Sequence, residues 1–115
     1  MATNPIPLNK FRLLASTLVS GSNLIYSTSI DVSTIVLSCQ VTNKSASTQF
    51  TTVQLTKSGS SEVFTLMKDG AIPVSESLNP LAGKLVLEKG DSFFLTSNVS
   101  GSLDAVLSVL ENANN

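Results

Sequence analysis

The chain has 115 residues, of which only 13% are charged, with seven Lys and Arg against eight Asp and Glu. This length predicts one domain, and the absence of a basic cluster excludes nucleic acid as an expected partner. There is no histidine and one cysteine, Cys39, which excludes the common catalytic triads, zinc sites and intrachain disulfides. No apolar run approaches the ~20 residues of a membrane span, so we expect no membrane partner.

The first ten residues differ from the rest of the chain. Residues 1–10 contain two prolines and show no hydrophobic periodicity, and no signal peptide is predicted there. We expect an extended N-terminal arm, because Ile6, Leu8 and the following Phe11 are apolar side chains that need a surface to cover them. The hypothesis is that these three residues anchor the arm on a neighbouring subunit. The alternative is a frayed terminus.

Residues 11–112 are predicted to form a β-sandwich domain, and 113–115 a short C-terminal tail. Segments 11–19 and 23–30 form a predicted strand pair about a Ser-Gly-Ser turn. Residues 34–42 alternate next, with an apolar face of Ile35, Leu37, Cys39 and Val41. Residues 49–57 repeat the pattern, with 51, 53 and 55 on one face, and the turn residues between the two segments favour a hairpin.

Further short strands follow at turn-like spacing. Residues 62–68 form one, which Asp69 and Gly70 are expected to end. A connection over 71–83 contains two prolines and leads to residues 84–88 and 92–98. These last two segments are expected to be the arms of a hairpin.

The C-terminal segment 103–112 fits either a helical stripe or a strand. We favour a strand because the segment follows a Ser-Gly turn and a series of similar elements. The total is about eight short strands, which predicts an all-β fold: a single antiparallel β-sandwich, jelly-roll-like, with an extended N-terminal arm.

The densest group of charges surrounds a glycine, in the turn formed by Glu88, Lys89, Gly90 and Asp91. Glu88 and Asp91 could serve a small carboxylate hydrolase or bind calcium, but calcium needs more converging oxygen ligands. Lys-Gly before Asp is ordinary turn chemistry, since Gly takes the positive φ and Asp bonds to the turn backbone. We therefore predict a structural turn. Cys39 is expected to be a buried, unreactive thiol, and no catalytic, cofactor-binding or metal-binding residue is predicted.

Several short patterns together resemble one family. They are QVTN at 40–43, IP at 72–73, L-x-GKLVLE-x-GD at 81–91 and G-x-L-D-x-x-LS-x-LE at 101–111. Over residues 11–112 the chain resembles small β-sandwich virion proteins of tailed bacteriophages, often found in phages of cyanobacteria and other aquatic bacteria.

The resemblance implies a non-enzymatic structural protein, located in the virion and made in the host bacterial cytoplasm. A capsid decoration or cement protein is the first expectation. A neck, tail or baseplate accessory protein, or a receptor- or glycan-binding virion module, is the alternative. The implied partners are other virion proteins, such as the major capsid protein, and further copies of the chain in a homo-oligomer, a trimer or a ring.

Overall fold

The computed structural model describes residues 8–29, 32–60, 62–81 and 83–113, and every regular element in them is a β-strand. The strands are β1 (Leu8–Thr17), β2 (Gly21–Ser27), β3 (Ser33–Asn43), β4 (Gln49–Thr56), β5 (Val63–Ile72), β6 (Ser77–Leu78), β7 (Leu85–Leu87), β8 (Ser92–Ser97) and β9 (Leu103–Ala113).

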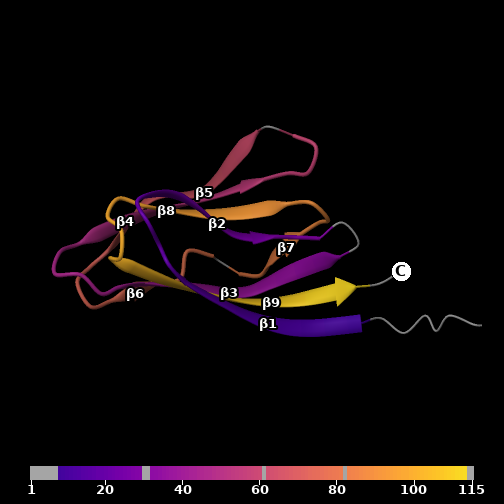
Figure 1. The fold of residues 1–115 in the computed structure, drawn as a ribbon, viewed down its shortest axis with the longest axis horizontal. Helices are drawn as coiled ribbons and strands as arrows, with labels where there is room; N and C mark the ends of the chain where they lie inside the picture. Colours follow the sequence, from indigo (N-terminus) through magenta and orange to yellow (C-terminus); the bar gives the residue numbers. More distant parts are fainter. Residues whose placement is uncertain (1–7, 30–31, 61, 82, 114–115) are drawn as a thin grey trace, which may run out of the picture.

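The strands form two antiparallel sheets that pack face to face (Figure 1). The lower sheet in that view has the order β1-β9-β3-β6, with β7 also paired to β3; the upper sheet has the order β2-β8-β4-β5. Most connections carry the chain from one sheet to the other, which is the double Greek-key arrangement of a jelly roll. The expected all-β, jelly-roll-like sandwich is confirmed, with nine strands in the described residues.

The three predicted hairpins are wrong. In each of them the two strands belong to different sheets: β1 and β2, β3 and β4, and β7 and β8. A turn signal marks where the chain reverses, but the reversal can cross the ~10 Å between packed sheets as readily as it joins neighbours within one. Of the strands that follow one another along the chain, β4 and β5 do pair within a sheet.

The predicted apolar face of β3 is wrong in its first half. A β-bulge between Val36 and Ser38 shifts the register with β9. Val36 is therefore fully buried, whereas Ile35 and Leu37 are only half-buried. From Cys39 onward the strand follows the predicted alternation, because the extra residue changes the phase once. In β4, positions 51, 53 and 55 are buried as predicted.

Asp69 and Gly70 do not end their strand. β5 continues to Ile72, and the pairing with β4 shifts register around Asp69, which has a φ of 52°. A Cβ at Gly70 would overlap the Met67 sulfur, so any larger residue here would require the Met67 side chain to move. The connection that follows contains β6. The C-terminal segment is a strand, as predicted, and β9 lies between β1 and β3.

The boundaries of the domain also move. Leu8 pairs with Ala113 at the outer end of the β1–β9 ladder. Residues 8–10 therefore belong to the sheet and not to the expected arm, and residue 113 belongs to β9 and not to the expected tail. Residues 1–7, which include Ile6, lie outside the described part of the chain.

Both sheets contribute to one core. Buried Asn43 fastens the corner where β3 leaves the lower sheet, donating hydrogen bonds to the carbonyls of Ile72 (2.9 Å) and Ser47 (2.8 Å). A buried amide needs such partners, and here they come from segments that lead into and out of the upper sheet. The largest fully buried apolar side chains are Leu18, Val36, Val41, Val53, Ile72, Leu87, Phe93, Leu95, Leu103, Leu107 and Val109.

Candidate functional site

The charged turn lies where the chain passes from β7 in the lower sheet to β8 in the upper sheet. The Asp91 amide donates a hydrogen bond to the Glu88 carbonyl (3.0 Å), which closes a β-turn, and Gly90 has a φ of 84°. Thr28, just after β2, bonds to the last two residues of the turn, because its carbonyl accepts from the Gly90 amide and its amide donates to the Asp91 carbonyl. The turn is therefore held from within the fold.

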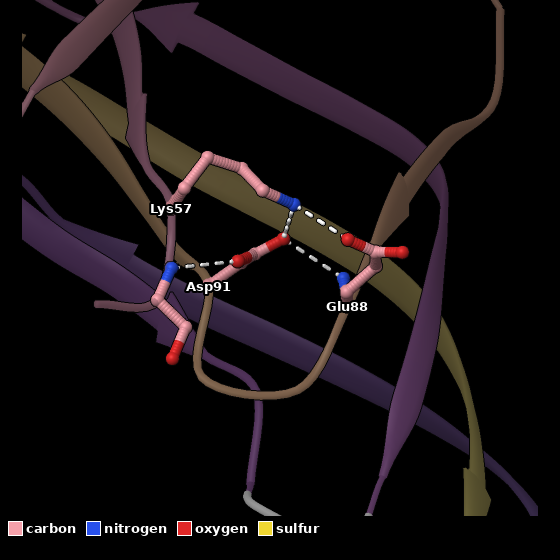
Figure 2. Close-up of polar contacts among 4 residues, drawn as sticks. Lys57, Glu88 and Asp91 are labelled. Carbon is pink, nitrogen blue, oxygen red and sulfur yellow. Dashed lines mark hydrogen bonds and ion pairs between the residues drawn. The ribbon is translucent and has the colours of Figure 1, made fainter. Parts of the chain in front are cut away.

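The Asp91 side chain points inward and is only 1% exposed. Its Oδ1 accepts a hydrogen bond from the Ser58 amide (3.0 Å), and its Oδ2 accepts from the Glu88 amide (2.9 Å) and from Lys57 Nζ (2.8 Å). Lys57 Nζ also contacts Glu88 Oε1 at 2.8 Å. Figure 2 shows the ammonium group between the two carboxylates, with backbone donors completing the shell of Asp91.

Burial of Asp91 alone would raise its pKa. The hydrogen bonds from Lys57 and from the amides of Ser58 and Glu88 outweigh burial, and the pKa of Asp91 lies below its ordinary value. The hydrogen bonds to Asp91 and then to Glu88 raise the pKa of Lys57. Both groups therefore stay charged over the whole neutral range.

This arrangement is suited to fastening a turn. A general acid needs a raised pKa, and a general base needs an oxygen free to reach substrate, whereas both oxygens of Asp91 already accept hydrogen bonds from the chain. Glu88 is 74% exposed and contacts the same ammonium group. Within the described ranges, no three His, Cys, Asp or Glu side chains lie close enough together to hold a metal ion.

Sequence reasoning missed Lys57, the residue that completes this cluster. Lys57 directly follows β4 and lies 34 positions before Asp91 in the chain. The scarcity of charge was the available signal, because a buried carboxylate requires a cation and few are present. The contact between Lys57 and Asp91 could not be deduced from the sequence, because the expected hairpin placed β7 and β8 in one sheet, whereas they lie in different sheets.

A second polar network joins the two sheets. Tyr26 of β2 donates a hydrogen bond to Glu111 Oε2 of β9, and its hydroxyl lies 2.8 Å from Thr34 Oγ1 of β3. Arg12 of β1 contacts the same Glu111 oxygen at 3.0 Å. Burial, followed by the hydrogen bond to Glu111, raises the pKa of Tyr26 to about 12. Burial would raise the pKa of Glu111, but the hydrogen bonds from Tyr26 and Arg12 lower it.

The remaining candidate residues are separate from both networks. Phe11 lies in β1 with 73% of its surface exposed, and Leu8 is the first residue of that strand. Cys39 is buried in the core, and burial raises its pKa to about 12, so the thiol is unreactive at neutral pH, as expected. In the part of the chain that the structure covers, there is no helix long and apolar enough to cross a membrane.

No protein-family model matches the chain, and no curated protein matches it in sequence. Solved structures are similar in fold. A protein of Bacillus endospore appendages, described as a family of disulfide-linked pili, has a TM-score of 0.58 at 9% identity and covers 98% of this chain and 93% of its own.

Two further structures extend the comparison. A protein of the infectious bursal disease virus particle has a TM-score of 0.58 at 7% identity, with 92% of this chain covered; the match spans 31% of the viral chain. The core of a Drosophila protein, NLP, described for pentamer formation and histone binding, has a TM-score of 0.51 at 12% identity and covers 89% of this chain and 97% of its own. At these identities, the likeness is one of fold.

Proposed function

We propose that this chain is a non-enzymatic structural protein of a bacteriophage particle, and specifically a capsid decoration or cement protein. The observation that carries the proposal is the jelly-roll order of its two sheets, β1-β9-β3-β6 and β2-β8-β4-β5, together with the resemblance of its turns to phage virion proteins. Viral particles, pili and a pentamer are the assemblies named for proteins of similar fold, and such sandwiches are common building blocks of capsids.

The use of charge in the fold supports this proposal. The buried carboxylate Asp91 and the partly buried Glu111 are both engaged in fastening one segment to another. Several large apolar side chains are instead exposed, among them Phe11, Leu13 and Val86. A protein that works by assembly needs apolar contact surface more than it needs a reactive group.

Assembly is proposed to use the N-terminal arm and strand edges. β1 closes one side of the lower sheet and is ten residues long, so its outer edge offers backbone groups to another strand. β5 closes the upper sheet, but its bulge interrupts that edge. The proposed arm is residues 1–7, which precede β1 in the sequence, and Ile6 is its proposed anchor on a neighbouring subunit.

The test uses purified particles of the phage that carries the gene. Immunogold labelling on the capsid surface is the expected result; label at the neck, tail or baseplate would favour the accessory role, and unlabelled particles would contradict the proposal. Deleting residues 2–7 should abolish binding of the recombinant protein to particles while the sandwich stays folded, because β1 begins at Leu8. A deletion variant that still binds would contradict the arm as the docking element.

The glycan-binding alternative has less support. Sugar sites commonly use exposed Trp or Tyr side chains; the chain has no Trp, and its single Tyr26 is 6% exposed and hydrogen-bonded to Glu111 and Thr34. The absence of binding on a glycan array would contradict this alternative.

A further inference from the structure

The outer face of the lower sheet carries a row of apolar side chains. In the strand register, Phe11 lies opposite Leu110, Leu110 opposite Ile35, and Ile35 opposite Val86. Residues directly opposite one another share a face, and Val109, the next residue along β9, is fully buried, so this row points outward. Phe11 is 73% and Val86 63% exposed, and the two residues between them are half-buried. The row crosses β1, β9, β3 and β7.

The same face is uneven beside this row. Leu13, 69% exposed, is the next outward residue on β1, and Ala15 follows it opposite Val106. A hollow of about 310 Å³ lies here, lined by Ala15, Ser16, Thr17, Asp104, Ala105 and Val106. Two large side chains therefore project from β1, and a hollow follows within the next few residues of the same strand.

We infer that this apolar outer face (Phe11, Leu13, Ile35, Val86, Val106 and Leu110) binds the same face of a second copy of the chain. A twofold axis between Leu13 and Ala15 would place the projecting side chains of each copy over the hollow of the other. Both hollows are then filled at once, which is the self-complementarity that an isologous contact requires. The inference adds a partner and a contact surface to the proposed function, and the role of this dimer in a virus particle rests on that proposed function.

The size of the face fits this occupant. Six apolar side chains, on average about half exposed, present roughly 500 Å², near the upper end of the largest apolar patch on a typical monomer. A standard interface buries about 800 Å² on each partner, of which somewhat more than half is apolar. The face therefore supplies the apolar part of one complete interface.

The polarity of the face also favours a second copy. Beside the projecting residues, the outward positions on β9 and β3 are Ser108, Ser38 and Gln40, which carry no charge. Asp104, at the far end of the hollow, is already paired with Lys44 at 3.2 Å. An identical face brought against this one would meet no like charge at its centre, whereas a strongly basic or acidic partner would find nothing there to pair with.

The first experiment measures self-association by sedimentation equilibrium. Leu13→Lys places a charge at the centre of the contact, and Leu24→Lys is the matched control, because Leu24 is 58% exposed but belongs to the upper sheet. The wild type and Leu24→Lys should form dimers with equal dissociation constants, and Leu13→Lys should weaken dimerisation at least about tenfold. Circular dichroism verifies the fold, and Leu13→Thr provides a second variant that keeps strand propensity.

The second experiment tests the geometry by cross-linking. Under mild oxidation, mixed Leu13→Cys and Ala15→Cys chains should form a disulfide between variants faster than Leu24→Cys chains link to one another. The native Cys39 is buried and does not compete. Cross-linking no faster than in the Leu24→Cys control would overturn the proposed packing.

Particle binding separates this inference from the proposed function. A monomeric wild type whose Leu13→Lys variant loses particle binding would mean that another virion protein covers the face, which overturns the second copy and leaves the proposed function standing. A monomeric wild type with no such loss overturns the inference as well. A dimer that Leu13→Lys disrupts, in a protein that binds no particle, would support the inference and contradict the proposed function.

Discussion

Lys57 and Asp91 are 34 positions apart in the chain, and their charged atoms lie 2.8 Å apart. The contact joins the end of β4 to the turn between β7 and β8, where the chain changes sheets. Asp91 also accepts hydrogen bonds from the backbone amides of Ser58 and Glu88, so one buried carboxylate binds both the segment that follows β4 and its own turn. A connection between sheets lacks ladder hydrogen bonds of its own, and this carboxylate supplies the missing acceptors.

Replacing this carboxylate should cost stability. Asp91→Ala leaves the Ser58 and Glu88 amides without their acceptor in a site where the side chain is 1% exposed. We expect the free energy of unfolding to fall by about 2–4 kcal/mol, measured by urea denaturation.

The control for this prediction is a substitution of Glu88, the exposed carboxylate of the same cluster. Glu88→Gln changes a group that is 74% exposed, so its effect should be within about 0.5 kcal/mol. Lys57→Met should lower the free energy of unfolding less than Asp91→Ala does, because the backbone amides of Ser58 and Glu88 still donate to Asp91. Equal losses for Asp91→Ala and Glu88→Gln would contradict the assigned role of the buried carboxylate.

The glycine of this turn permits a sharper comparison. Gly90 has a φ of 84°, and a Cβ there would collide with the Ser58 side chain. Gly59 has a φ of 77° with open space around it, and Gly83 has neither constraint. Alanine should therefore cost about 2–3 kcal/mol at Gly90, about 1 kcal/mol at Gly59, and nothing or a slight gain at Gly83.

The order of thermal unfolding midpoints among these three variants provides the measurement. The midpoint of Gly90→Ala should be the lowest, because backbone strain and steric overlap act together there. If Gly90→Ala and Gly59→Ala had equal midpoints, the contact with Ser58 would contribute nothing.

The fold class could be predicted from the sequence because it follows from local features. Alternation in β4 and turn residues at short intervals report strands directly, and the count of strands implies a sandwich. The pairing of strands does not follow from local features. Whether the chain after Asn43 or after Leu87 stays in its sheet or crosses to the other depends on the packing of both layers, which turn residues do not encode. The β-bulge after Val36 likewise has no recognisable signal in the sequence.

The two polar networks show the same limit. The charged turn could be recognised because Gly90 and Asp91 are adjacent and have typical turn roles. Lys57 could not, since its contact depends on how two sheets are stacked. Tyr26 and Glu111 are 85 positions apart and meet only because β2 and β9 lie in facing sheets. The outer face of the lower sheet likewise becomes apparent only once β1, β9, β3 and β7 are placed side by side.

Acid should destabilise the protein because it protonates the hydrogen-bonded carboxylates Asp91 and Glu111. The folded-state pKa values of Asp91 and Glu111 lie below their ordinary values, so the ionised forms stabilise the fold above the unfolded-state values of about 4. That stability is lost as the pH falls through the folded-state values. The free energy of unfolding should be nearly flat between about pH 5 and 8, because the chain has no histidine, and should decline below about pH 4.

A series of urea denaturation curves from neutral to acidic pH measures this profile. Asp91→Asn should make the acid decline in the free energy of unfolding shallower, because it removes a carboxyl group whose pKa is lowered in the fold. If the free energy of unfolding of Asp91→Asn declined with acid as steeply as that of the wild type, the loss of stability could not be attributed to Asp91.

Tyr26 gives the corresponding prediction at alkaline pH. Its pKa is raised to about 12 in the fold, against about 10 in an unfolded chain, so the neutral phenol stabilises the fold fully below about pH 10 and that contribution is lost as the pH rises toward 12. The chain has one Tyr and no Trp, so ultraviolet absorbance reports this group alone. The midpoint should be about 12 for the folded protein and about 10 in urea. Glu111→Gln should lower the folded midpoint, because it removes the negative acceptor that favours the protonated phenol. A folded midpoint near 10, with circular dichroism unchanged, would mean that Tyr26 does not hold the two sheets together through Glu111.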